Sequence, residues 1–126
     1  MVKKIVLVSL LLSCFFWINN SCSKKDPSTI KIYVRSLNNN TLVSNADVII
    51  ISDLQSGTNI PSYVDTLKTN SSGYVTFEID SFFDLMESNN TTCDFDIIAK
   101  KDTLQGIGKL VGISKHTTNV ETVYLY

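Results

Sequence analysis

Residues that carry most enzyme chemistry are scarce in this chain. Its 126 residues include one histidine and three cysteines. No Cys-x-x-Cys pair is present for redox chemistry or zinc binding. The chain also has no nucleophile elbow, no phosphate-cradling glycine loop and no zinc-binding helix motif. These absences predict that the protein is not an enzyme and that it uses no metal or other cofactor.

The chain also lacks an excess of positive charge, and it contains little alanine. Lysine and arginine total 11 against 12 acidic residues, for a net charge of -1. This balance excludes the basic surface that nucleic-acid binding requires. Only two alanines occur, whereas isoleucine, valine and threonine are abundant, and this composition favours strands over helices. A chain of this length allows a single domain.

What the sequence does have is a hydrophobic amino terminus. A basic segment, residues 1–4, precedes fourteen residues without charge, 5–18. Such a run is too short to cross about 30 Å of hydrocarbon comfortably, so it predicts an export signal. The Ser-Cys junction at Cys22 resembles the site where bacterial lipoprotein signal peptidase cleaves, and Ser-Cys-Ser-Lys-Lys-Asp resembles the start of mature Bacteroidetes-type lipoproteins. The resemblance implies that Cys22 is acylated.

A second cysteine competes with Cys22 as the acylation site. Leu-Leu-Ser-Cys ending at Cys14 also fits the lipoprotein pattern, but cleavage there would leave an apolar stretch, 15–17, at the start of the mature chain. We therefore predict acylation at Cys22, with ordinary secretion and cleavage elsewhere as the remaining alternative. The predicted parts are a cleaved signal over 1–21, a lipidated cysteine and tether over 22–28, and a domain over 29–126.

Two or more acyl chains on Cys22 would anchor the mature protein stably in a lipid bilayer. Lys3 and Lys4 leave with the signal, so the net charge falls from -1 to -3. The charged residues after Cys22 loosely resemble signals that send such lipoproteins to the cell surface. We predict an outer-membrane lipoprotein that faces the periplasm or the cell surface.

Alternating apolar and polar residues predict an all-β domain. Seven short segments with this period of two are separated by turn signals, which is the pattern of an antiparallel sandwich of immunoglobulin-like or transthyretin-like type. One segment near 81–88 fits a short helical connection better than a strand. The expected strands are 29–35, 46–52, 63–68, 74–79, 93–100, 104–113 and 120–126.

Three segments, 43–50, 69–77 and 95–100, resemble the signature segments of carboxypeptidase regulatory-like domains, which have a transthyretin-like sandwich. The most specific is Thr-Asn-Ser-Ser-Gly-Tyr, in which Gly73 is expected to take a positive φ. Asn45 stands where the family has glycine, and asparagine also tolerates the left-handed conformation. The family has no common active site, so the resemblance implies architecture and an extracytoplasmic scaffolding or binding role.

Few side chains offer chemistry of their own. Cys93 is the only thiol left once Cys22 is acylated, and we expect it to be buried at the start of a strand. His116 is expected in a solvated loop. Asp94 and Asp96 share a face of one strand and could act as an acid and base pair or hold calcium, but a lone Asp-x-Asp supplies too few ligands. The simpler interpretation places both carboxylates on the wet face of the strand.

Tyrosines and two threonines are the remaining candidates. Tyr124 and Tyr126 share a face of the last strand, where they could stack on sugars or contact a protein, although strands favour tyrosine in any case. Tyr33, Tyr63 and Tyr74 are also expected to lie outward. Asp-Thr-Leu at Thr66 and at Thr103 resembles the O-glycosylation acceptor of exported Bacteroidetes-type proteins; both threonines must then be exposed.

The sequence thus predicts a membrane-anchored lipoprotein that displays a non-enzymatic binding or assembly module to an envelope protein or an adhesive fibre. A glycan-binding module is the alternative. A cluster of exposed tyrosines would favour sugar, and an exposed aliphatic strand edge would favour strand addition by a protein. Convergence of Asp94, Asp96 and His116 in a pocket would favour an enzyme.

Overall fold

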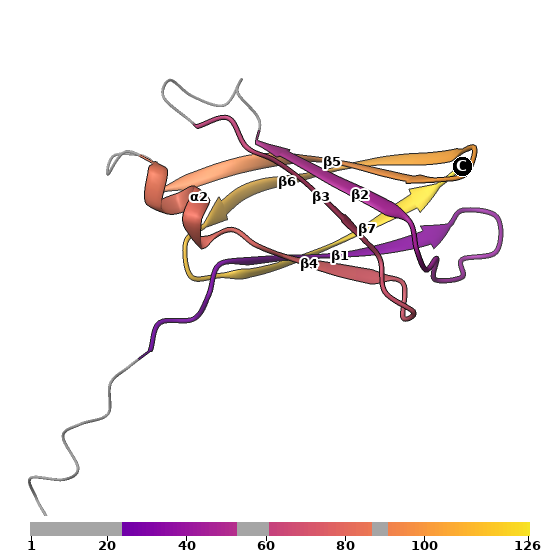
Figure 1. The fold of residues 1–126 in the computed structure, drawn as a ribbon, viewed down its shortest axis with the longest axis horizontal. Coiled ribbons are helices and arrows are strands. Elements are labelled where there is room, and N and C mark those ends of the chain that lie inside the picture. The colour runs from indigo at the N-terminus through magenta and orange to yellow at the C-terminus, as the bar shows by residue number, and fades with distance from the viewer. Residues whose placement is uncertain (1–23, 53–60, 87–90) are drawn as a thin grey trace, which may run out of the picture.

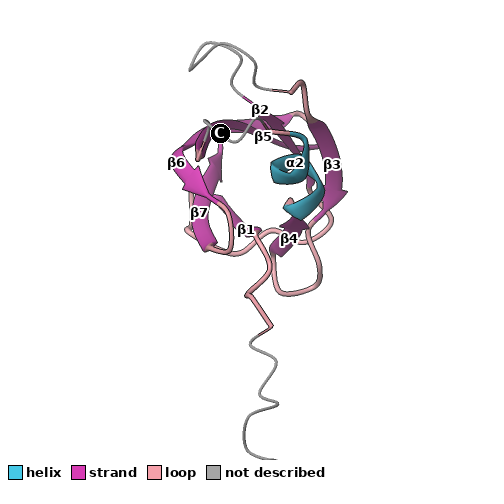
Figure 2. Ribbon diagram, turned by 90° about the vertical axis from the view of Figure 1, so that its left-hand side faces the viewer, coloured by secondary structure: helices cyan, strands magenta, loops and turns pink. Residues whose placement is uncertain are grey.

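The computed structural model describes residues 24–52, 61–86 and 91–126. Cys14, Cys22 and the predicted signal lie outside these ranges. The described residues form two facing sheets with one short helix at an end, as Figures 1 and 2 show. The elements are β1 (Thr29–Ser36), β2 (Asp47–Ser52), β3 (Val64–Lys68), β4 (Tyr74–Glu78), α2 (Asp80–Leu85), β5 (Thr92–Lys101), β6 (Leu104–Ser114) and β7 (Thr118–Leu125).

The strand order is β4-β1-β7 in one sheet and β3-β2-β5-β6 in the other. The all-β sandwich with a short helical connection is therefore confirmed. One strand pair departs from the predicted antiparallel pattern, because β1 and β7 run parallel. Both strands begin at the same end of the sandwich, where Thr29 pairs with Thr118, so they must point the same way.

The core lies between the sheets and is closed at one end by α2 (Figure 2). Alternate residues of β1, β2, β4 and β5 supply it, as the period of two requires, together with residues of β6 and β7. Phe82 of α2 is 1% exposed, and its ring lies 5.4 Å from that of Tyr63 and 5.2 Å from that of Phe95, measured between centroids. Both ring pairs meet at an angle, which suits the charge distribution of aromatic rings.

The turn between β3 and β4, which carries the chain from one sheet to the other, fixes the opposite end of the sandwich. Thr69 is 4% exposed; its Oγ1 accepts a hydrogen bond from the Ala46 N–H at 2.9 Å and donates one to the Val43 carbonyl at 2.8 Å. Gly73 has φ of 73° and Asn45 has φ of 58°, so both left-handed conformations predicted for these positions are confirmed. The segment before β2 is thereby held to the start of the β3–β4 turn by hydrogen bonds of the buried Thr69 side chain.

The two sheets also meet where β6 passes β7. Backbone hydrogen bonds join Gln105 and Tyr126 at 3.3 and 3.1 Å. Gly106 faces the Tyr124 carbonyl so closely that a Cβ at this position would overlap it. Glycine at position 106 therefore permits the close approach that closes this side of the sandwich.

The amino-terminal segment joins the domain at Ser28, which is buried rather than part of a free tether. Its N–H donates to Oδ1 of Asp80 at 2.8 Å, and its Oγ accepts from the His116 N–H at 2.8 Å. Hydrogen bonds from the side chain and backbone of Ser28, with help from nearby positive charge, hold the pKa of Asp80 below its ordinary value. His116 is thus a contact of the amino-terminal segment, with Nδ1 2.8 Å from the Asp26 carbonyl oxygen.

Candidate functional site

The outer face of the four-stranded sheet is aliphatic where a solvated sheet face is usually polar. Of its aliphatic side chains, Val64 is 61% exposed, Ile107 72% and Val111 70%, while the isoleucines of β2 and β5 on this face are half-buried. Contiguous exposed apolar surface of this kind marks interaction sites. We call this surface the aliphatic face; its members are Ile49, Ile51, Val64, Ile98, Ile107 and Val111.

Strand register brings these side chains into rows across the sheet. Ile49 of β2 pairs with Ile98 of β5, which in turn pairs with Ile107 of β6. An open groove of about 610 Å³ follows the face. Its lining residues are Ile51, Asp96, Ile97, Ile98, Ile107, Gly108 and Lys109.

Charged residues lie on both sides of the row of Ile49, Ile98 and Ile107 along the strands, and on one side they share a row with Ile51 and Val64. Asp96 and Lys109 lie opposite each other in β5 and β6, with 3.9 Å between Oδ1 and Nζ. At the other end Asp47 lies between Lys68 and Lys100 in the register of β3, β2 and β5. The Asp47 carboxylate is 2.6 Å from the Lys68 ammonium. Charges of both signs therefore frame an apolar centre.

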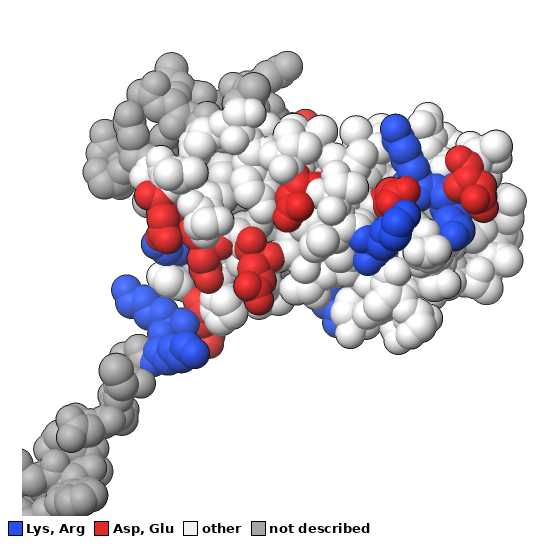
Figure 3. All heavy atoms as spheres, viewed as in Figure 1, with Lys and Arg blue, Asp and Glu red and all other residues white. Residues whose placement is uncertain are grey.

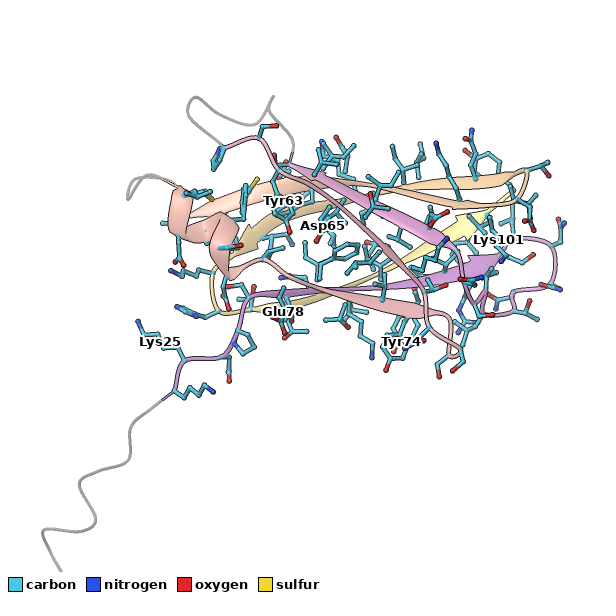
Figure 4. All side chains as sticks on the ribbon, in the orientation of Figure 1. Lys25, Tyr63, Asp65, Tyr74, Glu78 and Lys101 are labelled. Atoms are coloured by element: carbon cyan, nitrogen blue, oxygen red, sulfur yellow. The ribbon has the colours of Figure 1, made fainter. Side chains whose placement is uncertain are left out.

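The outer face of the three-stranded sheet is aromatic instead. The rings of Tyr33 and Tyr74 lie 5.5 Å apart, and Nζ of Lys31 is 4.1 Å from the Tyr74 centroid and 5.0 Å from that of Tyr33. Figure 4 shows Tyr74 directed away from the space between the sheets. A hydrogen bond with Tyr33 raises the pKa of Lys31 above its ordinary value. Lys31 thus occupies part of the ring surface, as in other cation–π contacts.

Tyr124 extends this aromatic surface, since it lies opposite Arg35 across β1 and β7. Tyr124 is 42% exposed and Tyr126, just beyond β7, is 60% exposed, so both predicted contact tyrosines are accessible. We call the outer surface formed by Tyr33, Tyr74, Tyr124, Lys31 and Arg35 the tyrosine face.

The prediction that Tyr63 lies outward is wrong. Its ring packs against the core residues Phe82 and Phe95, because Tyr63 extends β3 on the inner side of the sheet. Its hydroxyl donates to Oδ2 of Asp65 at 3.3 Å, and the two side chains lie together along β3 in Figure 4. Burial, and then the neighbouring Asp65 carboxylate, raise the pKa of Tyr63 above its ordinary value.

The free edge of β3 is shielded against strand addition. Antiparallel alternation turns the backbone of Asp65 toward β2 and that of Thr66 toward the open edge. Oδ1 of Asp65 accepts the hydrogen bond from the Thr66 N–H at 2.8 Å. A carboxylate on an edge strand is a known device against edge-to-edge pairing. The exposed Val64 and Leu67 therefore offer side-chain contact more readily than backbone pairing.

The residues considered for catalysis do not converge. Oδ1 of Asp94 accepts the Gly112 N–H at 2.8 Å, and Asp96 faces Lys109, whereas the hydrogen bonds of His116 go to Asp26 and Ser28. In the parts of the chain that the structure describes, no group of three potential metal-ligating side chains is present. Cys93 is 2% exposed, as expected.

Both candidate O-glycosylation residues are exposed. Thr66 lies on the outer side of β3, opposite Ile49 of the aliphatic face, and Thr103 lies in the turn between β5 and β6. Exposure meets the condition set by the sequence pattern, and modification of Thr66 and Thr103 remains a prediction. A glycan on Thr66 would border the aliphatic face.

The aliphatic face is the feature that sequence reasoning missed. Four consecutive apolar β-branched residues, Val48–Ile51, are typical of a strand buried on both sides. In the structure only Val48 and Ile50 are fully buried, and Ile49 and Ile51 face outward. The same holds for Ile97 and Ile98, of which the first is buried. Consecutive isoleucines in a strand were the available signal, because alternate positions must face opposite sides.

Comparison with known proteins assigns neither a family nor a function. No protein-family model matches the chain, and no curated protein matches it. The chain is similar to a solved structure described as "Crystal Structure of S.CueP", with 7% sequence identity and a TM-score of 0.47. That likeness covers 82% of this chain and 63% of the other, and it carries no inference about function. Among the described residues, no helix has the length and hydropathy to cross a bilayer.

Proposed function

We propose that this protein is an outer-membrane lipoprotein, acylated at Cys22, whose sandwich is a non-enzymatic module that binds an envelope protein. The observation that carries the proposal is the aliphatic face. Its side chains offer no hydrogen bonds, so its affinity must come from removing apolar surface from water. An apolar protein surface provides such a partner, and a hydroxyl-rich sugar does not.

The proposed organisation, a lipid anchor followed by one domain, rests on the resemblance to Bacteroidetes-type lipoproteins and to carboxypeptidase regulatory-like domains. The described residues add a tether with exposed Lys24 and Lys25 that leaves the domain at Ser28. In Figure 3 acidic side chains gather at the end of the domain near this tether, and the opposite end carries charges of both signs. The two flat faces of the sandwich are then free to contact partners beside it.

A glycan-binding module is the second candidate, favoured by the tyrosine face. Tyr124 presents a rigid amphipathic ring beside the Arg35 guanidinium, a combination that can stack on a sugar and bind its polar groups. Tyr33 and Tyr74 are less available, because Lys31 lies over their rings. This occupation is why the aliphatic face, rather than the tyrosine face, supports the favoured function.

Ile107→Glu is expected to abolish partner binding without unfolding the domain. A buried charge in an apolar contact costs several kcal/mol or more when it is unpaired, and Ile107 is 72% exposed in the free chain. Thr76→Glu is the matched control, because Thr76 is an exposed strand residue on the other sheet. Chemical crosslinking of full-length protein in cell envelopes, followed by mass spectrometry, would measure the captured species.

The expected result is capture by the wild type and by Thr76→Glu, and loss of capture in Ile107→Glu. Equal capture by both variants would contradict the assignment of the aliphatic face. Loss of capture on substituting Tyr124 instead, together with retention in Ile107→Glu, would move the function to the tyrosine face.

A further inference from the structure

We propose that the partner of the aliphatic face is a second copy of this chain, packed face to face about a two-fold axis that runs along the strands. This inference rests on the proposed binding role of the aliphatic face and names its occupant. Sheets that pack face to face keep their strand directions within about 30° and interdigitate side chains across about 10 Å.

The register of the sheet shows what such an axis would bring together. If the axis passes between β2 and β5, β2 of one copy lies over β5 of the other. Ile49 of β2 and Ile98 of β5 are cross-strand neighbours at the same height along the strands. The axis therefore packs Ile49 of one copy on Ile98 of the second copy. A self-complementary contact of this kind is formed by two-fold dimers, the commonest homo-oligomers.

Charge complementarity selects the same axis. Asp47 and Lys100 are also cross-strand neighbours in β2 and β5, two positions along from Ile49 and Ile98. The axis therefore places the Asp47 carboxylate of each copy opposite the Lys100 ammonium of the other. On the other side of Ile49 and Ile98, Asp96 keeps Lys109 of its own chain at 3.9 Å and comes to lie opposite Ile51 of the second copy. Unlike charges thus meet between the copies on the Asp47 side of the isoleucines, which favours this register.

Membrane anchoring favours the same arrangement. The chain enters the domain at the end that carries α2, as Figure 1 shows. A two-fold axis along the strands leaves both amino-terminal segments at the same end of the dimer, so both acylated Cys22 residues reach one membrane. An in-plane axis across the strands would send them to opposite ends. The dimer axis then stands perpendicular to the bilayer.

Disulfide crosslinking in cell envelopes tests this pairing with the full chain. Two tagged copies are co-expressed, one with Ile49→Cys and the other with Ile98→Cys, and oxidation is expected to join them. The native thiol of Cys93 is buried and does not compete. Thr76→Cys with Val120→Cys is the matched control, because these exposed residues lie in one row of the other sheet.

Charge reversal supplies a second measurement. Asp47→Lys or Lys100→Asp alone puts like charges opposite each other, and each is expected to lower the crosslinking yield about two- to fivefold, as rim charge pairs do. Asp47→Lys in one copy with Lys100→Asp in the other restores the unlike pairs between copies, and the yield, while each chain keeps like charges at its own neighbouring positions 47 and 100. Rescue of this kind requires that the two residues face each other between copies.

A 49–98 disulfide well above the control, with rescue when the two charge reversals are carried by different copies, supports the dimer. A 49–98 yield no higher than that of the control pair overturns it. If the dimer is absent while Ile107→Glu still abolishes capture of a different envelope protein, self-pairing fails and the proposed binding function stands. If neither self-pairing nor any capture depends on Ile107, both proposals fail.

Discussion

Replacing Phe82 with alanine is expected to lower the free energy of unfolding by about 3–5 kcal/mol, the usual cost of removing a buried aromatic ring. Phe82 is 1% exposed and contacts the rings of Tyr63, Phe83 and Phe95, with centroids 5.2 to 5.4 Å away. Helix α2 holds this ring across the open end of the sandwich. Its removal leaves a cavity that the two sheets cannot fill. Urea unfolding followed by circular dichroism measures the effect.

Leu85→Ala is the matched control for Phe82→Ala. Leu85 belongs to the same six-residue helix but is 74% exposed, so its replacement is expected to change stability by less than about 0.5 kcal/mol. If Phe82→Ala is no more destabilising than Leu85→Ala, α2 does not close the core as described.

Gly73→Ala is expected to destabilise the protein by about 2–5 kcal/mol through two costs. A left-handed backbone costs a residue with a Cβ roughly 1–2 kcal/mol, and Gly73 has φ of 73°. The new Cβ would lie 2.7 Å from Cβ of Leu42 and 3.0 Å from the Val43 nitrogen, and overpacking of this kind costs typically about 1–3 kcal/mol. Both neighbours belong to the segment that Thr69 holds in place.

Gly112→Ala separates these two costs. Gly112 has φ of 68°, but no atom lies within 4 Å of where its Cβ would be. The Gly112→Ala variant should therefore lose only the roughly 1–2 kcal/mol of unfolding free energy that the left-handed backbone costs a residue with a Cβ. Equal losses of unfolding free energy at positions 73 and 112 would show that the contact with Leu42 is not a constraint.

Local pattern was sufficient to predict most of the fold. The alternation of Ile30, Ile32 and Val34 placed the first strand, and these side chains are fully buried. The positive φ of Gly73 followed from turn chemistry, and that of Asn45 from the resemblance to a family that has glycine at this position. The parallel pairing of β1 with β7 did not follow, because strand order depends on contacts between the two ends of the chain, which periodicity within one segment does not record.

The candidate sites were less accessible to sequence reasoning. The outward exposure of Tyr124 was predicted, but Tyr63 turned inward, since its position beside α2 depends on how the helix closes the core. His116 contacts Ser28, which lies 88 residues earlier in the sequence. No local pattern predicts a contact between residues so far apart in the chain. The aliphatic face emerges only when register aligns Ile49, Ile98 and Ile107 in one row.

Membrane anchoring at Cys22 is the central claim, because both the displayed binding role and the orientation of the dimer depend on it. Metabolic labelling with a radioactive fatty acid, combined with membrane fractionation, tests it directly. We predict that Cys22→Ala abolishes the label and releases the protein from the membrane fraction, while Cys14→Ala retains both. A labelled, membrane-bound Cys22→Ala protein would contradict the account.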